Sequence, residues 1–144
     1  MELFFVSLLD FLTEFELKRN KMIKSLLIDQ DVIRGIGNSY SDEILWLARI
    51  SPYSIASAIP ETKVKDLYTA IKKILKAEIK NIDKHHPGKV NGEVKEFLVI
   101  HTREKTKSPG GAAIIIDQKG MMKTYYTKEQ KLYKWTIALY NQIC

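Results

Sequence analysis

The sequence predicts a mainly α-helical protein with one small β-hairpin in its C-terminal part. Apolar residues recur at helical spacing in several segments up to residue 82, whereas turn signals and short β-type runs dominate after residue 85. The chain has 144 residues, of which 45% are hydrophobic and 28% charged, which is ordinary for one globular domain. One compact unit with a small appendage is therefore expected.

The first two helices are expected at residues 3–19 and 25–33. In the first segment Asp, Thr and Glu separate apolar positions at helical spacing, and in the second Leu, Ile and Val recur at the same spacing. The second segment meets Gly35-Ile36-Gly37-Asn38. Because two glycines and an asparagine adopt positive φ at little cost, a sharp turn is predicted there.

Two further helices are expected after this turn. Asn38 or Ser39 is predicted to cap the first of them, whose apolar positions alternate with polar ones until Ser51-Pro52 ends it. The second begins near Pro60 and carries a long apolar stripe up to Ile82. Its lysines lie mainly off that stripe, where a solvated face explains them as well as contacts with a polyanion do.

A β-hairpin and a last helix are expected after residue 85. Pro-Gly and Asn-Gly pairs mark turns there, and the β-type runs are residues 97–100, 112–116 and 122–126. The last two runs are joined through residues 117–120, a spacing that favours a hairpin. Residues 129–143 have apolar positions at helical spacing and are predicted to form a final helix.

Positive charge is concentrated in the second part of the chain. Residues 1–52 hold 6 Lys and Arg against 8 Asp and Glu, a net charge of −2, whereas residues 53–144 hold 17 against 9, a net charge of +8. This balance favours a polyanionic partner such as nucleic acid, with lysines that merely aid solubility as the alternative. No apolar run has the ~20 residues that cross a bilayer, so neither a membrane protein nor a membrane partner is expected.

Three consecutive stretches carry a resemblance to a known family. They are Ile23-Lys24-Ser25-Leu26-Leu27-Ile28-Asp29-Gln30, then Gly35-Ile36-Gly37-Asn38-Ser39-Tyr40-Ser41-Asp42-Glu43-Ile44-Leu45, then Ala48-Arg49-Ile50-Ser51-Pro52. In order and spacing they resemble the helix-two-turn-helix domain of the formamidopyrimidine-DNA glycosylase and endonuclease VIII family. The resemblance implies a helix-two-turn-helix DNA-binding domain at residues 1–86 and a β-hairpin finger at 87–130. Residues 131–144, which lie beyond the resemblance, are expected to add a short C-terminal helix.

The resemblance also implies DNA phosphate contacts from both of the larger parts. Lys24 matches a basic contact residue of the family, and the backbone of Gly37 can approach a phosphate at a helix N-terminus. Asn38 can donate its amide hydrogens to the same phosphate, with helix capping alone as the alternative. In the finger, His101 and Arg103 stand where the family offers an aromatic or imidazole donor and an arginine.

The finger departs from the family pattern in two places. The family commonly holds its finger with four zinc-binding cysteines, but residues 107–111 and 126–130 contain none, and Cys144 is the only cysteine in the chain. A zincless finger, with no metal and no cofactor, is therefore expected. At the hairpin tip Met122 replaces the family's phosphate-binding arginine, with Lys123 beside it and Lys119 earlier in the turn, so that any phosphate clamp there depends on lysine.

The expected function is that of a cytoplasmic, nucleoid-associated module of base-excision repair that binds duplex DNA, with or without oxidised bases or abasic sites. The family's catalytic N-terminal proline and adjacent glutamate belong to a β-rich domain, whereas this chain begins Met1-Glu2-Leu3. No catalytic residue is assigned, and the chain alone is expected to be inactive. Two alternatives stay open: an intact DNA glycosylase and AP lyase when joined to a missing N-terminal half, and an RNA-binding helix-two-turn-helix protein.

Overall fold

Helices make up most of the regular structure, and one β-hairpin lies beside them. The computed structural model describes residues 20–29, 36–85 and 98–134. In chain order the elements are α2 (Ile23–Leu27), α3 (Asn38–Ala48), the 3-10 helix η1 (Ala56–Ala58), α4 (Glu61–His85), β1 (Ile115–Lys119) and β2 (Met122–Tyr126). The predicted fold class, mainly α with a small β-hairpin, is confirmed. The helix expected at residues 3–19 lies outside the described residues.

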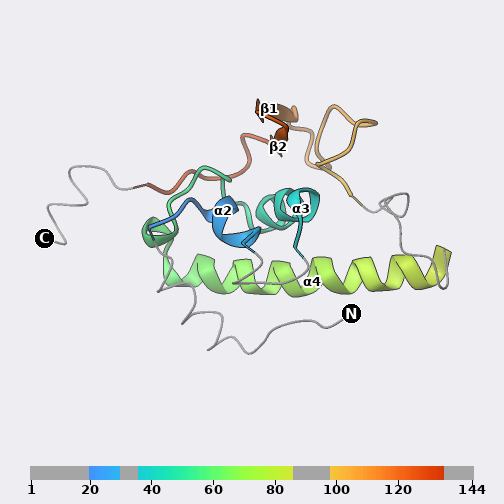
Figure 1. Ribbon diagram of the computed structural model, residues 1–144, viewed down its shortest axis with the longest axis horizontal. Coiled ribbons are helices and arrows are strands. Elements are labelled where there is room, and N and C mark those ends of the chain that lie inside the picture. Colours follow the sequence, from blue (N-terminus) through green and yellow to red (C-terminus); the bar gives the residue numbers. More distant parts are fainter. Residues whose placement is uncertain (1–19, 30–35, 86–97, 135–144) are drawn as a thin grey trace, which may run out of the picture.

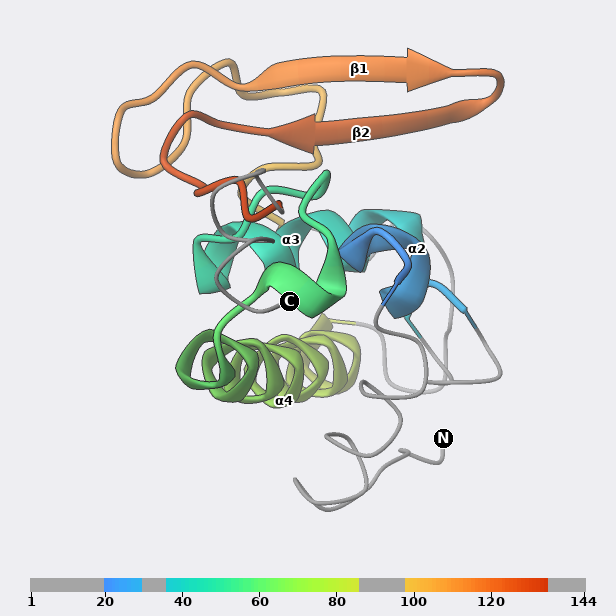
Figure 2. The ribbon, with the colours of Figure 1, turned by 90° about the vertical axis from the view of Figure 1, so that its left-hand side faces the viewer.

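The elements are arranged in three layers. Figure 1 shows α4 running along one side of α2 and α3, and in Figure 2 the hairpin covers the opposite side of α3. The middle layer is therefore covered on both sides. As a result the polar residues Ser41, Asp42 and Glu43, which sequence alone places on a polar face of α3, are buried beneath the segments after residue 98.

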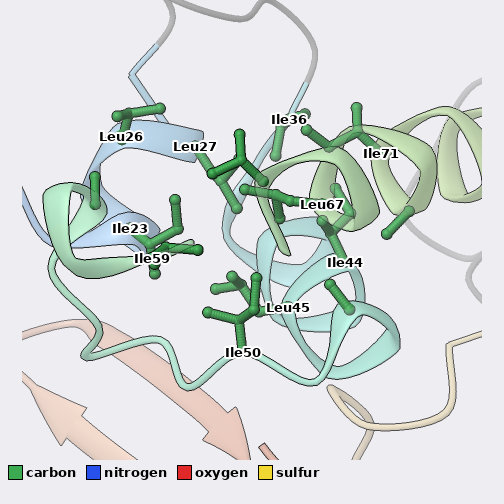
Figure 3. Close-up of a cluster of buried hydrophobic side chains, with 14 of the residues drawn as sticks. Ile23, Leu26, Leu27, Ile36, Ile44, Leu45, Ile50, Ile59, Leu67 and Ile71 are labelled. Carbon is green, nitrogen blue, oxygen red and sulfur yellow. The ribbon is translucent and has the colours of Figure 1, made fainter. Parts of the chain in front are cut away.

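The hydrophobic core lies between α2, α3 and α4 (Figure 3). Leu27 of α2, Ile44 and Leu45 of α3, and Leu67 and Ile71 of α4 are all fully buried there. Full burial of one such side chain stabilises the fold by about 1.5–3 kcal/mol. The apolar stripe that predicts the long helix is the surface that packs on α3, so the core fixes where the N-terminal end of α3 lies.

Two helix boundaries differ modestly from the predictions. α2 begins at Ile23 and ends at Leu27, whereas the predicted helix covers 25–33, of which residues 30–33 lie outside the described part. α4 begins at Glu61, directly after Pro60, as predicted, but it ends at His85, three residues beyond Ile82. The burial of its apolar stripe has faded at Ile79, which is 38% exposed. Among the described residues, no helix combines the length and the apolar character that a membrane span requires.

The start of α3 contradicts the predicted side-chain cap. Gly37 is the N-cap residue, and Asn38 is already the first helical residue, so capping by Asn38 or Ser39 is wrong. The physical reason is that the Asn38 amide is used elsewhere, because its Nδ2 donates to the backbone oxygen of Lys123 at 2.9 Å. Gly37 has a φ of −97°, so this glycine does not adopt the positive φ that the sequence suggests.

β1 and β2 form a regular antiparallel hairpin. Ile115 lies opposite Tyr126 and Lys119 opposite Met122, so β2 has its predicted range while β1 begins three residues late. Residues 117–119 belong to β1 rather than to the turn, which consists of Gly120 and the residue after it. Gly120 has a φ of 60°, as the first central residue of a type II′ turn requires, and this turn fits the twist of two paired strands.

The end of the described chain is not helical, contrary to the helix predicted at residues 129–143. Lys131 N donates to Arg49 O at 2.9 Å, Ser51 N donates to Lys131 O at 2.8 Å, and Ile55 N donates to Tyr133 O at 2.8 Å. Residues 131–133 therefore run alongside residues 49–55. Their backbone groups bond to this neighbouring segment instead of to residues one helical turn away, and residues 135–143 lie outside the described part.

Candidate functional site

Asp42 of α3 is a buried carboxylate that joins three segments of the chain. Its Oδ1 lies 2.9 Å from Nζ of Lys24, which is also buried, and this contact is an ion pair rather than an aligned hydrogen bond. Its Oδ2 accepts the backbone N–H of Tyr125 at 3.0 Å and lies 2.6 Å from Nδ1 of His101. Lys24 Nζ in turn donates to Oγ1 of Thr124 at 2.7 Å. One carboxylate thus fixes an ammonium group, an imidazole and strand β2.

Glu43, the next residue of α3, holds the chain segment that leads to His101. Its Oε1 accepts the backbone N–H of Val99 at 2.9 Å, and its Oε2 accepts those of Ile100 at 2.8 Å and His101 at 2.6 Å. The strand predicted at residues 97–100 is therefore wrong for 98–100, because these N–H groups bond to a carboxylate instead of to a neighbouring strand. Burial raises the pKa of Glu43, against the opposite effect of the three N–H groups.

The imidazole of His101 is held in one orientation. Its ring stacks on that of Tyr125, with 4.0 Å between the centroids and 29° between the planes, while Nδ1 faces Asp42. The buried carboxylate therefore determines which ring nitrogen is available, and Nε2 is the nitrogen that remains for a ligand.

A cavity of about 660 Å³ lies where the N-terminal end of α3, residues 98–104 and the hairpin meet. Three of its lining residues carry side-chain N–H groups that a ligand can use: Asn38, Arg103 and Lys123. His101 also lines the cavity. Glu104 is the acidic residue in the lining. Arg103 is exposed and Lys123 half-buried, so the cavity presents a guanidinium and an ammonium group to a ligand that enters it. Such a site suits an acceptor-rich anion.

The predicted site residues divide between two cavities. Asn38, His101, Arg103 and Lys123 lie together in the larger one, and Gly37 is exposed directly before Asn38. A second cavity of about 90 Å³, between α2 and the hairpin, is lined by the other three residues: Lys24, Lys119 and Met122. The ammonium of Lys24 has partners inside the protein, so its predicted contact with phosphate stays a prediction.

Sequence reasoning missed the two acidic residues that build the site. Asp42 and Glu43 alternate with apolar residues, which is typical of a solvated helix face. A single sequence holds no signal that separates a solvated polar face from one that another segment covers. Asn38, at the start of the same helix, is also partly covered. Its Oδ1 is buried and has no hydrogen-bond partner among the residues that the structure describes.

Acidic and basic side chains of residues 98–134 differ in where they point. This segment holds 8 Lys and Arg against 3 Asp and Glu, a net charge of +5. Asp117 accepts a hydrogen bond from the hydroxyl of Tyr53, and Glu129 accepts three from neighbouring side chains. Burial, followed by the hydrogen bond to Asp117, raises the pKa of Tyr53. Two of the three acids are thus turned inward, whereas Arg103 and Lys119 are exposed.

Hydrogen bonds to Glu129 join residues 107–111 to residues 126–130, the two stretches that stand where the family has its zinc-binding cysteine pairs. Its Oε1 accepts from Oγ of Ser108 at 2.6 Å, Oγ1 of Thr127 at 3.0 Å and Nε1 of Trp46 at 2.9 Å. A Cβ atom at Gly110 would lie 2.1 Å from Oε2 of Glu129, so the loop passes close to this carboxylate. In the described part of the chain, no three His, Cys, Asp or Glu residues gather where they could hold a metal ion.

These bonds predict a pH dependence that is centred on Glu129. The hydrogen bonds from Ser108 and then Trp46 hold the pKa of Glu129 below its usual value of 4.5. A lowered pKa means that the bonds stabilise the fold above about pH 4.5 and that this contribution is lost as the pH falls through the lowered value. In a Trp135→Phe background, Trp46 fluorescence should change over that acidic range, and Glu129→Gln should remove the change. The same titration with and without Glu129 would contradict the assignment.

A family model described as the formamidopyrimidine-DNA glycosylase H2TH domain matches residues 7–86 of the sequence. This chain belongs to that family. The formamidopyrimidine-DNA glycosylase of Lactobacillus gasseri is 36% identical over 124 residues, which is 81% of this chain and 45% of that protein. The chain therefore spans less than half the length of this relative.

Solved structures of the same family resemble the fold. The complex between Lactococcus lactis Fpg and DNA with an abasic site has a TM-score of 0.67 at 29% identity, over 84% of this chain and 47% of that one. MutM in complex with DNA that contains carbocyclic 8-oxo-G has a TM-score of 0.70 at 28% identity, over 84% and 47%. The likeness to Fpg and MutM thus extends beyond the H2TH domain and includes the hairpin region.

Proposed function

We propose that this chain binds duplex DNA through its phosphates, as the C-terminal portion of a formamidopyrimidine-DNA glycosylase or endonuclease VIII-like protein of base-excision repair. The observation that carries the proposal is the larger cavity, where Asn38, Arg103 and Lys123 bring donors from three segments to one place. Phosphate oxygens accept hydrogen bonds, and cationic groups beside a helix N-terminus are a common phosphate site.

The charge distribution supports the same partner. Residues 98–134 carry a net charge of +5, and most of their acidic side chains bond to internal partners. Asp42 does not repel a phosphate strongly, because Lys24 neutralises it inside the protein at 2.9 Å. Family members solved in DNA complexes add independent support.

In this proposal the buried groups position the contact residues. Lys24 and Asp42 hold Thr124 and Tyr125 of β2, and Glu43 holds the backbone before Arg103. The hairpin serves as a finger whose shape depends on side-chain hydrogen bonds, including those of Glu129, rather than on zinc. The proposal also includes the expected location, the cytoplasm at the nucleoid.

Arg103 provides the variant that tests the DNA contact. Replacing Arg103 by alanine should weaken binding to a short duplex roughly tenfold at fixed ionic strength, because it removes a charge-assisted contact of about 1.5 kcal/mol. Lys73→Ala is the control with the same change in charge, since Lys73 is exposed on α4, and this helix lies on the opposite side of α3 from the hairpin (Figure 2). Fluorescence anisotropy would measure both. Equal losses in the two variants would contradict a contact at Arg103, and tighter binding of single-stranded RNA than of duplex DNA would favour an RNA-binding protein.

Catalysis is the second candidate function, because this chain matches a relative that is named as a glycosylase. The match spans only 45% of that relative. Such an enzyme would need the segment that this chain does not match. Borohydride trapping on an abasic duplex tests it: we expect no covalent adduct with this chain alone, and an adduct above that of an unrelated basic protein would assign lyase chemistry to it.

A further inference from the structure

The tip of the hairpin displays an apolar side chain on a fixed stem. Met121 is the second residue of the turn, directly after Gly120, and it is 100% exposed. Nε2 of Gln118 donates to Gly120 O at 3.0 Å, which braces the turn. Below the tip, Asp42 bonds to Tyr125 N at 3.0 Å, so strand β2 is anchored to α3.

The surroundings of this methionine are cationic. Lys119 and Lys123 flank the turn, and Met121 lines the same cavity as His101 and Arg103. A fully exposed methionine gains nothing from the protein around it, and it cannot make a favourable contact with a phosphate group. It is, however, long, flexible and polarisable, which suits it to packing on flat aromatic surfaces.

We propose that Met121 inserts between nucleobases of the bound duplex, at a point where base stacking is already interrupted. The proposal rests on the proposed DNA-binding function. The flanking lysines bring the tip to the phosphates, and the apolar side chain then enters the stack, as apolar wedges of minor-groove and architectural proteins do. Insertion into an intact stack has an unstacking cost that an abasic position has largely lost.

The phosphate contacts and the inserted methionine respond differently to the DNA substrate. The phosphate contacts of Arg103 and Lys123 are the same on intact and interrupted duplexes, so they add affinity without preference. Met121 adds affinity only where the stack opens. The tip therefore determines the preference for an interrupted duplex, a role distinct from the phosphate clamp for which the neighbouring lysines are suited.

The test compares two duplexes that differ only in one tetrahydrofuran abasic analogue, with 2-aminopurine next to it. The unaltered chain should bind the interrupted duplex more tightly and change the 2-aminopurine fluorescence. Met121→Ala should lower the ratio of the two affinities by up to about tenfold, as expected for the loss of a contact between a methionine and an aromatic ring, and abolish the fluorescence change. Because Met121→Ala removes no charge, the affinity of this variant should depend on salt concentration as that of the unaltered chain does.

Lys119→Ala is the matched control at the same turn. It should weaken binding to both duplexes equally and lower the salt slope by about 0.9, with the affinity ratio unchanged. An unchanged ratio in Met121→Ala, or a dimer of the unaltered chain that Met121→Ala dissociates in sedimentation, would overturn the wedge. If the unaltered chain binds neither duplex, the DNA-binding function itself fails, which separates the two failures. Circular dichroism confirms that each variant is folded.

Discussion

Replacing Asp42 by alanine is expected to lower the free energy of unfolding by about 3–5 kcal/mol, because it leaves a buried ammonium group without its counter-ion. The side chains of Asp42 and Lys24 are 0% and 7% exposed, so water cannot replace the lost partner without opening the structure. The same change removes the acceptor of the Tyr125 N–H and the partner of His101. The hairpin and the imidazole should therefore loosen together.

Urea unfolding followed by circular dichroism measures this loss. Asp66→Ala is the control, because Asp66 pairs with Lys63 at 3.5 Å while 61% exposed, and its loss should cost less than about 1 kcal/mol. Combining Asp42→Ala with Lys24→Met removes both charges and should cost less than the sum of the two single changes. Equal costs for the Asp42 and Asp66 variants, or simple additivity in the double variant, would contradict a buried ion pair that holds the site.

Replacing Glu43 by alanine is expected to detach residues 99–101 from α3. Each hydrogen bond to a charged group contributes about 1.5–3 kcal/mol, and three backbone N–H groups lose their acceptor at once, so a cost of about 3 kcal/mol or more is expected. Glu43→Gln keeps one acceptor oxygen and should have an intermediate effect. Arg103 would then lose its fixed position, and DNA affinity should fall with stability.

Amide hydrogen exchange of Val99, Ile100 and His101 measures the local part of this effect. Exchange should accelerate strongly in Glu43→Ala and remain unchanged in Glu61→Ala, whose side chain is 72% exposed on α4. Protected amides at residues 99–101 in Glu43→Ala would show that another acceptor holds this segment.

Sequence patterns predict the helices and strands in which buried residues recur at a regular spacing. The apolar stripe of residues 64–75 identifies α4 because burial against one neighbour imposes a helical period, and residues 122–126 identify β2 because β-type residues follow a turn. The family motif also draws attention to Asn38, which lines the larger cavity. These features depend on local spacing, which one sequence contains.

The rest depends on contacts between distant segments. Residues 98–100 have the composition of a strand, yet Glu43, more than fifty positions earlier, captures their N–H groups. Asn38 looks like a helix cap until Lys123 provides an acceptor 85 positions later. Residues 131–133 similarly bond to residues 49–55 instead of forming a helix. In each case a hydrogen bond to a distant segment overrides the local conformational preference, and residue spacing in the sequence does not reveal that partner.

The salt dependence of duplex affinity for the unaltered chain tests the central claim most directly. If Arg103, Lys119 and Lys123 each neutralise one phosphate, the logarithm of the association constant should fall with the logarithm of salt concentration with a slope of about −2 to −3. The slope should become shallower by about one unit in Arg103→Ala and remain unchanged in Met121→Ala. An affinity for duplex DNA that is independent of salt would contradict phosphate binding by this face of the protein.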